Sequence, residues 1–171
     1  MIGAGALERA REWMRHQANP PSVNALPLAA ALCKRFEGVS LRPYICVAGV
    51  ETIGFGATFY PTGGKVSLSD PPITLTQAED LLQFMLSSVF IPGVQRLCPN
   101  IEHPEQLAAI TDFAFNLGLG RLKASTLRRK INAGDWEAVP AELRKWTKGG
   151  GRTLRGLVAR REAEILLLGA A

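Results

Sequence analysis

The chain has 171 residues, 47% of them hydrophobic and 20% charged, a composition that is typical of a folded globular domain and excludes a disordered or fibrous chain. Its 20 lysines and arginines outnumber its 15 aspartates and glutamates, which gives a net charge of +5. A basic balance favours an anionic partner, such as a nucleic acid, a membrane surface or an acidic cell-wall polymer. The basic residues gather toward the C-terminus, where solvated helix faces and a polyanion-binding surface are both open interpretations.

Cysteine content and hydropathy bear on where the protein is made. Cys33, Cys46 and Cys98 are too few and too odd in number for a disulfide framework, and they indicate synthesis in a reducing compartment. Residues 1–17 lack the apolar core of a signal peptide. The longest nearly apolar run, residues 25–33, falls far short of the roughly 20 residues that a spanning helix needs. The sequence therefore predicts a protein with neither an export signal nor a membrane anchor.

The N-terminal segment is expected to form an appended helix. Residues 6–17 place four apolar residues at helical spacing among charged ones, namely Leu7, Ala10, Trp13 and Met14. The Asn19-Pro20-Pro21-Ser22 stretch then ends the helix. We predict a helical extension over residues 1–23 and one domain over residues 24–171.

The next predicted helix begins at Asn24 and ends at Glu37-Gly38. Its apolar stripe consists of Leu28, Leu32, Cys33 and Phe36. Gly38 suits the left-handed position that often ends a helix. Glu37 thus lies at the negative end of the helix dipole among apolar side chains, and both conditions favour a protonated carboxyl group.

A region with strand character follows, over residues 42–46 and 50–58, around a turn at residues 47–49. Gly54 and Gly56 leave one face of the second strand without side chains, which indicates close approach of a ligand or another backbone. After Thr74 the pattern is helical. The first expected helix is opened by a capping box of Thr76 and Glu79 and is interrupted or kinked around Pro92-Gly93. A helix over residues 104–117, one from Ser125 to Ala133, and one from Asp135 to Trp146 with a bend at Pro140 are expected next. After a flexible triple glycine at residues 149–151, Thr153 is expected to open a last helix.

These elements predict an α+β fold that is mostly α. We expect a small N-terminal αβ lobe with a short β-hairpin and a larger helical C-terminal lobe, with a cleft between them.

The segment around Glu37 carries the clearest chemical signal. Glycoside hydrolysis needs a carboxyl group kept protonated on one side of the bond and a base or nucleophile on the other. A glutamate that closes an apolar helix suits the first role. Tyr44, Cys46 and Thr52 follow it at short spacing. Glu51 is a weaker candidate for a second carboxylate, because neighbours on a strand point to opposite faces and Glu51 is expected to face away from the cleft.

The motifs resemble those of a known family. Arg35-Phe-Glu-Gly38, Tyr44 and Thr52-Ile-Gly-Phe-Gly56 are similar to the active-site segment of phage-type lysozymes, the endolysins of glycoside hydrolase family 24. The likeness extends over roughly residues 24–168 through further blocks in the same order, namely Phe113–Gly118, Ser125–Leu127, Asn132–Trp136, Trp146 and Gly156–Glu162.

The resemblance implies roles for seven residues. Glu37 stands where the family keeps its catalytic acid, and Thr52 where a threonine helps hold the attacking water. Phe115 and Asn116 fall on the helix that contacts the sugar chain, and Thr58 on a strand edge lining the cleft. Thr126 is a further substrate-binding candidate, although hydrogen bonding at a helix start explains it equally well. Cys46 stands at the middle catalytic position, which is usually aspartate, and Ala57 replaces a histidine that often follows the Thr-Ile-Gly-x-Gly stretch.

A cysteine at the middle position leaves two mechanisms open. An ordinary thiol has a pKa of about 8.5 and is only a few per cent ionised at neutral pH. As a thiolate, Cys46 could activate a water held with Thr52 and give inversion, or attack the anomeric carbon itself and give retention. The analogy with the family favours the water-assisted route. An inert small side chain at this position would leave a protein that binds peptidoglycan and cuts it poorly.

No metal site or other cofactor is predicted. His16 and His103 are far apart, without ligand spacing around them. Asp70 and Asp112 are interpreted first as surface or capping residues. Cys33 is expected to pack in the core, and a regulatory Cys33–Cys46 disulfide is a minor alternative.

The resemblance implies a muramidase that hydrolyses the β-1,4 bond between N-acetylmuramic acid and N-acetylglucosamine and lyses the bacterial host. We expect a monomer with peptidoglycan as its partner, stored in the host cytoplasm and released to the periplasmic wall through a separate membrane pore. A lytic transglycosylase and a non-catalytic wall-binding module are alternatives. A nucleic-acid binder is the least favoured, because the chain has no recognised nucleic-acid motif.

Overall fold

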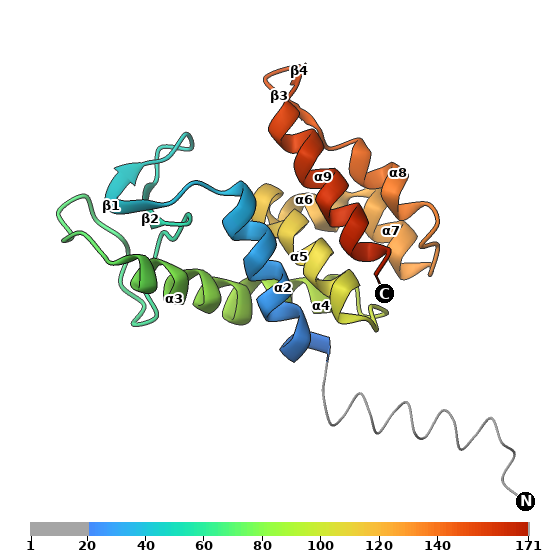
Figure 1. Cartoon of the computed structure of the whole chain (residues 1–171), viewed down its shortest axis with the longest axis horizontal. Coiled ribbons are helices and arrows are strands. Elements are labelled where there is room, and N and C mark those ends of the chain that lie inside the picture. Colours follow the sequence, from blue (N-terminus) through green and yellow to red (C-terminus); the bar gives the residue numbers. More distant parts are fainter. Residues whose placement is uncertain (1–20, 171) are drawn as a thin grey trace, which may run out of the picture.

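The computed structural model describes residues 21–170. The predicted N-terminal extension therefore lies almost entirely outside the described residues. The remainder is mostly helical and carries a small antiparallel hairpin, which confirms the predicted α+β class. The hairpin lies at one side of the molecule beside the start of α3, and the C-terminal helices form the other side (Figure 1).

Helix α2 (Pro21–Phe36) begins three residues earlier than predicted. Proline is tolerated in the first turn of a helix, where its missing N–H has no intrahelical acceptor. Ala25, Ala29 and Cys33 are fully buried along one side of α2, which packs mainly on α5. The helix ends at Phe36 and brings Glu37 to the surface of the core.

Strands β1 (Ser40–Ile45) and β2 (Glu51–Gly54) form the antiparallel hairpin, with Tyr44 opposite Thr52. The second strand is shorter than predicted. Gly54 and Gly56 have φ angles of +65° and +105°, so the chain turns back here and Ile53 pairs with Ala57. A Cβ atom on Gly54 would lie 3.4 Å from Ala78, so this glycine allows α3 to approach the strand.

Helix α3 (Leu75–Met85) opens with a capping box two residues earlier than predicted. The Thr74 hydroxyl accepts from the N–H of Gln77, and the Gln77 side chain accepts from the N–H of Thr74. Ala78 and Leu82 face the core from this helix. Because the spacing of Thr74 and Gln77 matches that of Thr76 and Glu79, sequence alone did not separate the two.

The predicted interruption of this helix is confirmed and begins before Pro92. A π-helical segment, η1 (Leu86–Phe90), connects α3 to α4 (Ile91–Leu97). Pro92 then falls in the first turn of α4. Gly93 lies against Leu119, whose Cδ1 atom would be 2.5 Å from a Cβ at that position.

Helix α5 (Pro104–Leu117) occupies the centre of the domain, and its start and end are as predicted. Every residue from Leu107 to Ala114 is buried, and the helix packs on α2 and α9. Because α5 is surrounded by other helices, any polar side chain on its middle turns must find a partner inside the protein.

Shorter helices complete the C-terminal part. Ser125 caps α7 (Thr126–Asn132), as predicted, by accepting from the N–H of Arg128 at 3.0 Å; α6 (Leu119–Ala124) precedes it. The prediction that Asp135 opens a helix is wrong, because its carboxylate pairs instead with Lys130. Helix α8 (Val139–Arg144) begins later, with Pro140 in its first turn, so this proline starts the helix and does not bend it.

The triple glycine was wrongly predicted to be a connector. Gly149 belongs to a short strand, and Gly150 and Gly151 form the turn of a second small hairpin, in which β3 (Lys148–Gly149) pairs with β4 (Arg152–Thr153). Positive φ angles at Gly150 and Gly151 fit such a turn. Thr153 belongs to strand β4 and does not open the last helix, because α9 (Arg155–Leu168) begins two residues later.

Candidate active site

Glu37 lies where three hollows of the surface meet. It follows the last residue of α2, and its N–H still donates to the carbonyl oxygen of Cys33 at 2.8 Å. The hollows have volumes of about 290, 390 and 360 Å³, and Glu37 lines all three. A single carboxyl group therefore lines three neighbouring hollows, which together are called the cleft below.

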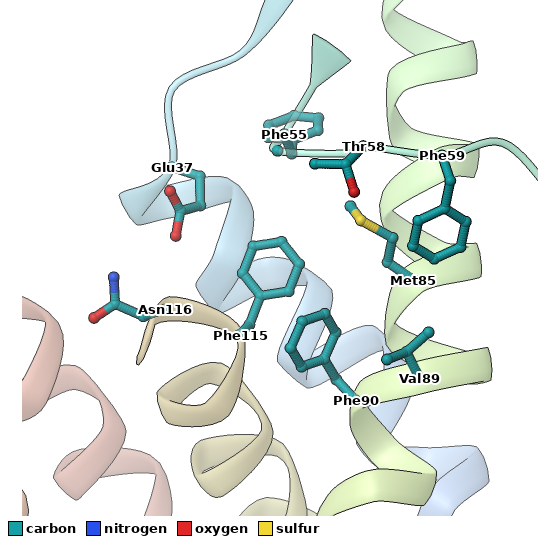
Figure 2. A pocket seen from close by; sticks show the side chains of 10 residues that line it. Glu37, Phe55, Thr58, Phe59, Met85, Val89, Phe90, Phe115 and Asn116 are labelled. Atoms are coloured by element: carbon teal, nitrogen blue, oxygen red, sulfur yellow. The ribbon is translucent and has the colours of Figure 1, made fainter. Parts of the chain in front are cut away.

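The first hollow brings together side chains from both sides of the molecule (Figure 2). Thr58 and Phe55 come from the hairpin side, whereas Phe115 and Asn116 come from the end of α5. Phe115 also packs against Phe90, with ring centroids 5.0 Å apart. The structure thus places three of the predicted substrate-binding residues beside Glu37, and it adds Phe59, Met85, Val89 and Phe90, which the sequence did not single out.

The other two hollows extend the cleft on either side of Glu37. One runs along Gly38, Val39, Ser40 and Tyr44 toward the hairpin. The other runs along Leu154, Gly156 and Leu157, at the start of α9. Such an elongated cleft suits a chain-like substrate that crosses the carboxyl group.

Cys46 and Thr52 line none of these three hollows. Cys46 begins the turn of the hairpin, where its N–H donates to the carbonyl oxygen of Val50 at 3.0 Å. Thr52 is buried, and its hydroxyl donates to the same carbonyl oxygen at 2.8 Å. Tyr44, between Glu37 and Cys46 in the chain, does line the second hollow.

Hydrogen bonds at the hairpin turn favour ionisation of Cys46. The backbone of Val50 contributes most to lowering the pKa of its thiol, followed by the Thr52 hydroxyl and the backbone of Ala48. The Thr52 hydroxyl has one hydrogen, so it serves either the thiolate or the Val50 carbonyl at one time. The pKa of Tyr44 is raised by burial and then by the negative charges of Cys46 and Glu37.

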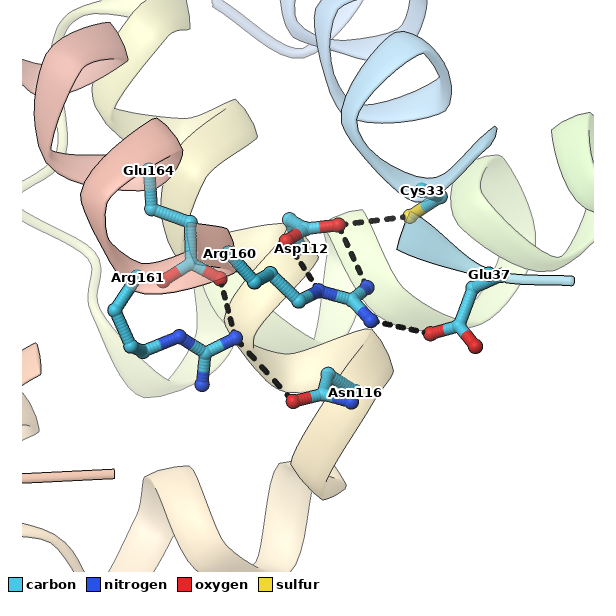
Figure 3. Close-up of polar contacts among 7 residues, drawn as sticks. All are labelled: Cys33, Glu37, Asp112, Asn116, Arg160, Arg161 and Glu164. Atoms are coloured by element: carbon cyan, nitrogen blue, oxygen red, sulfur yellow. Dashed lines mark hydrogen bonds and ion pairs between the residues drawn. The ribbon is translucent and has the colours of Figure 1, made fainter. Parts of the chain in front are cut away.

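Glu37 is held by a buried cation. The Arg160 guanidinium, 3% exposed, donates through Nη1 to Glu37 Oε1 at 2.5 Å. Its Nε and Nη2 donate to the two carboxylate oxygens of Asp112 at 2.8 Å each (Figure 3). Glu37 therefore has a charged partner, Arg160, in addition to the apolar side chains that the sequence led us to expect around it. Arg160 fixes one oxygen of Glu37, and its charge is shared with Asp112.

Asp112 is fully buried, which corrects its interpretation as a surface or capping residue. It lies on the core-facing side of α5 and also accepts from the Cys33 thiol at 3.2 Å. Cys33 is buried, as predicted, and burial followed by the Asp112 charge raises the pKa of its thiol. Cys33 and Cys46 are both free thiols.

Two residues of the basic C-terminal cluster are not on the surface. Arg160 and Arg161 are buried on α9, against the expectation of solvated faces or a polyanion-binding surface for these positions. The signal available in the sequence was an acidic residue within an apolar helix, Asp112, together with an Arg-Arg pair on another helix. Charges inside a core must be paired, and the topology decides which partners meet.

The remaining candidates lie elsewhere. Thr126 is in the first turn of α7, where its hydroxyl accepts from Arg129 at 2.8 Å, and it lines none of the hollows around Glu37. Glu51 accepts from the N–H of Leu68 at 3.0 Å and lines none of the hollows around Glu37. In the part of the chain that the structure describes, no three histidine, cysteine or acidic side chains cluster as metal ligands would. None of the helices between residues 21 and 170 has the length and apolar character needed to cross a bilayer.

A carboxyl group at the end of an apolar helix, lining a cleft between a hairpin and a helical lobe, is the arrangement expected of a glycoside hydrolase of the lysozyme type. Residues 34–164 match the Phage lysozyme family, and the chain belongs to this family.

Individual relatives agree with this assignment. The chain is 37% identical over 131 residues to the SAR-endolysin of Bacteriophage PS119, covering 75% of this chain and 73% of that protein. It is 38% identical over 141 residues to the endolysin of Acyrthosiphon pisum secondary endosymbiont phage 1, covering 80% and 91%. A mutant of P22 lysozyme has a similar structure, with a TM-score of 0.70 at 28% identity over 82% of this chain and 94% of that one.

Proposed function

We propose that this phage lysozyme is an endolysin that hydrolyses the β-1,4 bond between N-acetylmuramic acid and N-acetylglucosamine and so lyses the bacterial host. The main support for this proposal is the position of Glu37, which lines all three hollows and has one carboxylate oxygen held by Arg160. The relatives named endolysins support the same substrate, peptidoglycan.

In this proposal Glu37 is the general acid. Its free oxygen, Oε2, carries the proton to the glycosidic oxygen as the bond to the anomeric carbon breaks. Water attacks the anomeric carbon from the opposite face, and its proton passes to the Cys46 thiolate. The Thr52 hydroxyl helps hold that water. Thr58, Phe115 and Asn116 contact the sugar chain along the cleft.

The lowered pKa of Cys46 supports its role as the base, because a larger thiolate fraction is present at neutral pH than in an ordinary thiol. Activity that needs the thiolate rises as the pH rises through this pKa. Attack by the sulfur on the anomeric carbon is the competing route, and it gives retention in place of inversion. NMR of the first-formed product anomer separates the two routes.

Substitution of Cys46 tests its role directly. With reductant present, Cys46→Ser is expected to lose about 100-fold in wall lysis, because a hydroxyl does not ionise near neutral pH and a general base contributes at least this much. Cys46→Asp is expected to stay active, with the acid limb of its pH–rate profile at lower pH, since an ordinary aspartate has a pKa of about 3.9. Full activity of Cys46→Ser would contradict the thiolate base.

We also propose that the enzyme is stored in the host cytoplasm and reaches the periplasmic wall through a pore formed by a separate membrane protein.

One experiment tests both the reaction and the route. Bacteria expressing the chain are expected to keep their turbidity until chloroform permeabilises the inner membrane, and then to clear. Mass analysis of the released muropeptides is expected to show products with one added water per cut. Anhydro-sugar ends would identify a lytic transglycosylase instead, and clearing before permeabilisation would contradict the need for a pore.

A further inference from the structure

A fully buried ion pair on α9 lies next to Asn116, one of the residues that line the cleft. Arg161 and Glu164, one turn apart on α9, are both 0% exposed, and Arg161 Nη2 donates to Glu164 Oε1 at 2.6 Å. The guanidinium also lies over the ring of Phe113, 5.1 Å from its centroid. This pair has its own hydrogen bond but adjoins the network in which Arg160 serves Glu37 and Asp112 (Figure 3), and the charges of Asp112 and Arg160 both act on Glu164.

Several polar atoms of this buried pair lack hydrogen-bond partners. Among residues 21–170, Nε and Nη1 of Arg161 and Oε2 of Glu164 have no hydrogen-bond partner. Burying two charges costs several kcal/mol for each ion, and apolar replacements of such pairs are often neutral or stabilising. Stability alone therefore does not account for this pair, and its contact with the cleft is the feature to explain.

That contact is with Asn116. Arg161 Nη2 donates to Asn116 Oδ1 at 3.3 Å. Arginine has only donors, so the oxygen of the carboxamide must be the atom that faces it. The amide nitrogen then points the other way, toward the side of Glu37, as Figure 2 shows. No residue from 21 to 170 accepts a hydrogen bond from this nitrogen, although Asn116 lines two of the hollows.

We propose that Arg161 and Glu164 are positioning residues that fix the carboxamide of Asn116 with its two N–H donors facing the cleft beside Glu37. There they bind an acceptor oxygen of the sugar chain, and the carbonyl of an N-acetyl group is the acceptor that an amino-sugar polymer offers. Glu164 holds the guanidinium from behind, and Arg161 sets the polarity of the amide. The inference rests on the proposed function, since it assigns the chemistry of one subsite.

Removing the buried pair as a unit tests this. The double variant Arg161→Met/Glu164→Leu replaces the pair with apolar side chains of similar volume and is expected to keep or raise the melting temperature. Its KM for purified peptidoglycan is expected to rise about tenfold while kcat changes less than about threefold, the pattern of a lost binding interaction. A role in stability alone predicts the opposite, a change in melting temperature with KM unchanged.

The exposed pair Arg144–Glu162 is a matched control. Arg144 on α8 donates two hydrogen bonds to the carboxylate of Glu162 on α9, at 2.7 and 2.9 Å. Neither residue lines the hollows around Glu37. Arg144→Met/Glu162→Leu is expected to leave KM and kcat as in the wild type.

Asn116→Asp probes the subsite without touching the pair. Aspartate still accepts from Arg161 and presents an acceptor to the cleft in place of the donors, so we expect the same rise in KM, and weaker binding of tri-N-acetylchitotriose by calorimetry. Wild-type KM in a folded double variant, or in Asn116→Asp if the double variant does not fold, overturns the inference. A wild-type protein that neither binds the trisaccharide nor cuts peptidoglycan defeats the proposed function instead.

Discussion

Replacing Glu37 with glutamine is expected to lower the rate of wall lysis by about 100- to 10,000-fold while the protein stays folded. A general acid contributes roughly 10²- to 10⁴-fold to such a reaction, and an amide cannot donate the proton that the leaving oxygen needs. Glutamine keeps an oxygen that can accept from Arg160 Nη1, so the buried guanidinium retains its contacts. Turbidity clearing and urea unfolding, measured on the same preparation, separate the two effects.

Glu51→Gln is the matched control for that experiment. Glu51 is on the same lobe, and its carboxylate accepts from the backbone of Leu68 outside the cleft. We expect its variant to lyse walls as the wild type does. If Glu37→Gln cleared walls at the wild-type rate, Glu37 would not be the acid, and wall binding without cleavage by this carboxyl would be the better description.

Asp112→Leu is expected to lower the free energy of unfolding by about 3–5 kcal/mol, the range found when one partner of a buried ion pair is removed. Asp112 accepts two hydrogen bonds from Arg160 and one from Cys33, in a place with no access to solvent. Leucine fills the volume and leaves the guanidinium with Glu37 alone. Urea unfolding followed by circular dichroism measures the loss.

Two control variants test whether the lost free energy of unfolding comes from an unpaired buried charge. Glu162→Leu removes the carboxylate of an exposed pair, and a surface pair contributes about 0–1 kcal/mol. The double variant Asp112→Leu/Arg160→Met removes both buried charges and is expected to recover most of the stability. Equal losses for Asp112→Leu and Glu162→Leu would contradict the account of the buried network.

The sequence predicted the helices best where a local signal is unique. Pro104 and Gly118 bound α5 as expected, and Ser125 caps α7. The prediction failed where two local solutions compete, as at the start of α3, because the choice of Thr74 over Thr76 depends on the path of the incoming chain. The glycines at 149–151 likewise fit a connector or a hairpin, and only pairing of their neighbours decides.

The candidate site was predictable in part for a similar reason. Glu37, Thr58, Phe115 and Asn116 lie on segments whose motifs are local, and the fold brings them to one hollow. The buried ion pair of Asp112 and Arg160, which holds Glu37, was not predictable from sequence spacing. The two residues are 48 positions apart and meet only because α5 packs on α9. An Arg-rich helix has the same composition whether its charges face water or a buried carboxylate.

The π-helical segment η1 has a consequence for the shape of the cleft. Wider i→i+5 bonding takes up one residue more than an α-helix would, so everything after Phe90 is rotated by roughly 100° about the helix axis relative to a straight continuation of α3. Helix α3 therefore buries Ala78 and Leu82 beside the hairpin, and α4 turns Ile91 and Val94 toward the helical lobe. Val89 and Phe90 line the cleft between them. Helix α3, the five-residue π-helical segment and α4 thus follow one another without a loop, and this change of winding lets one stretch of chain pack on both sides of the cleft.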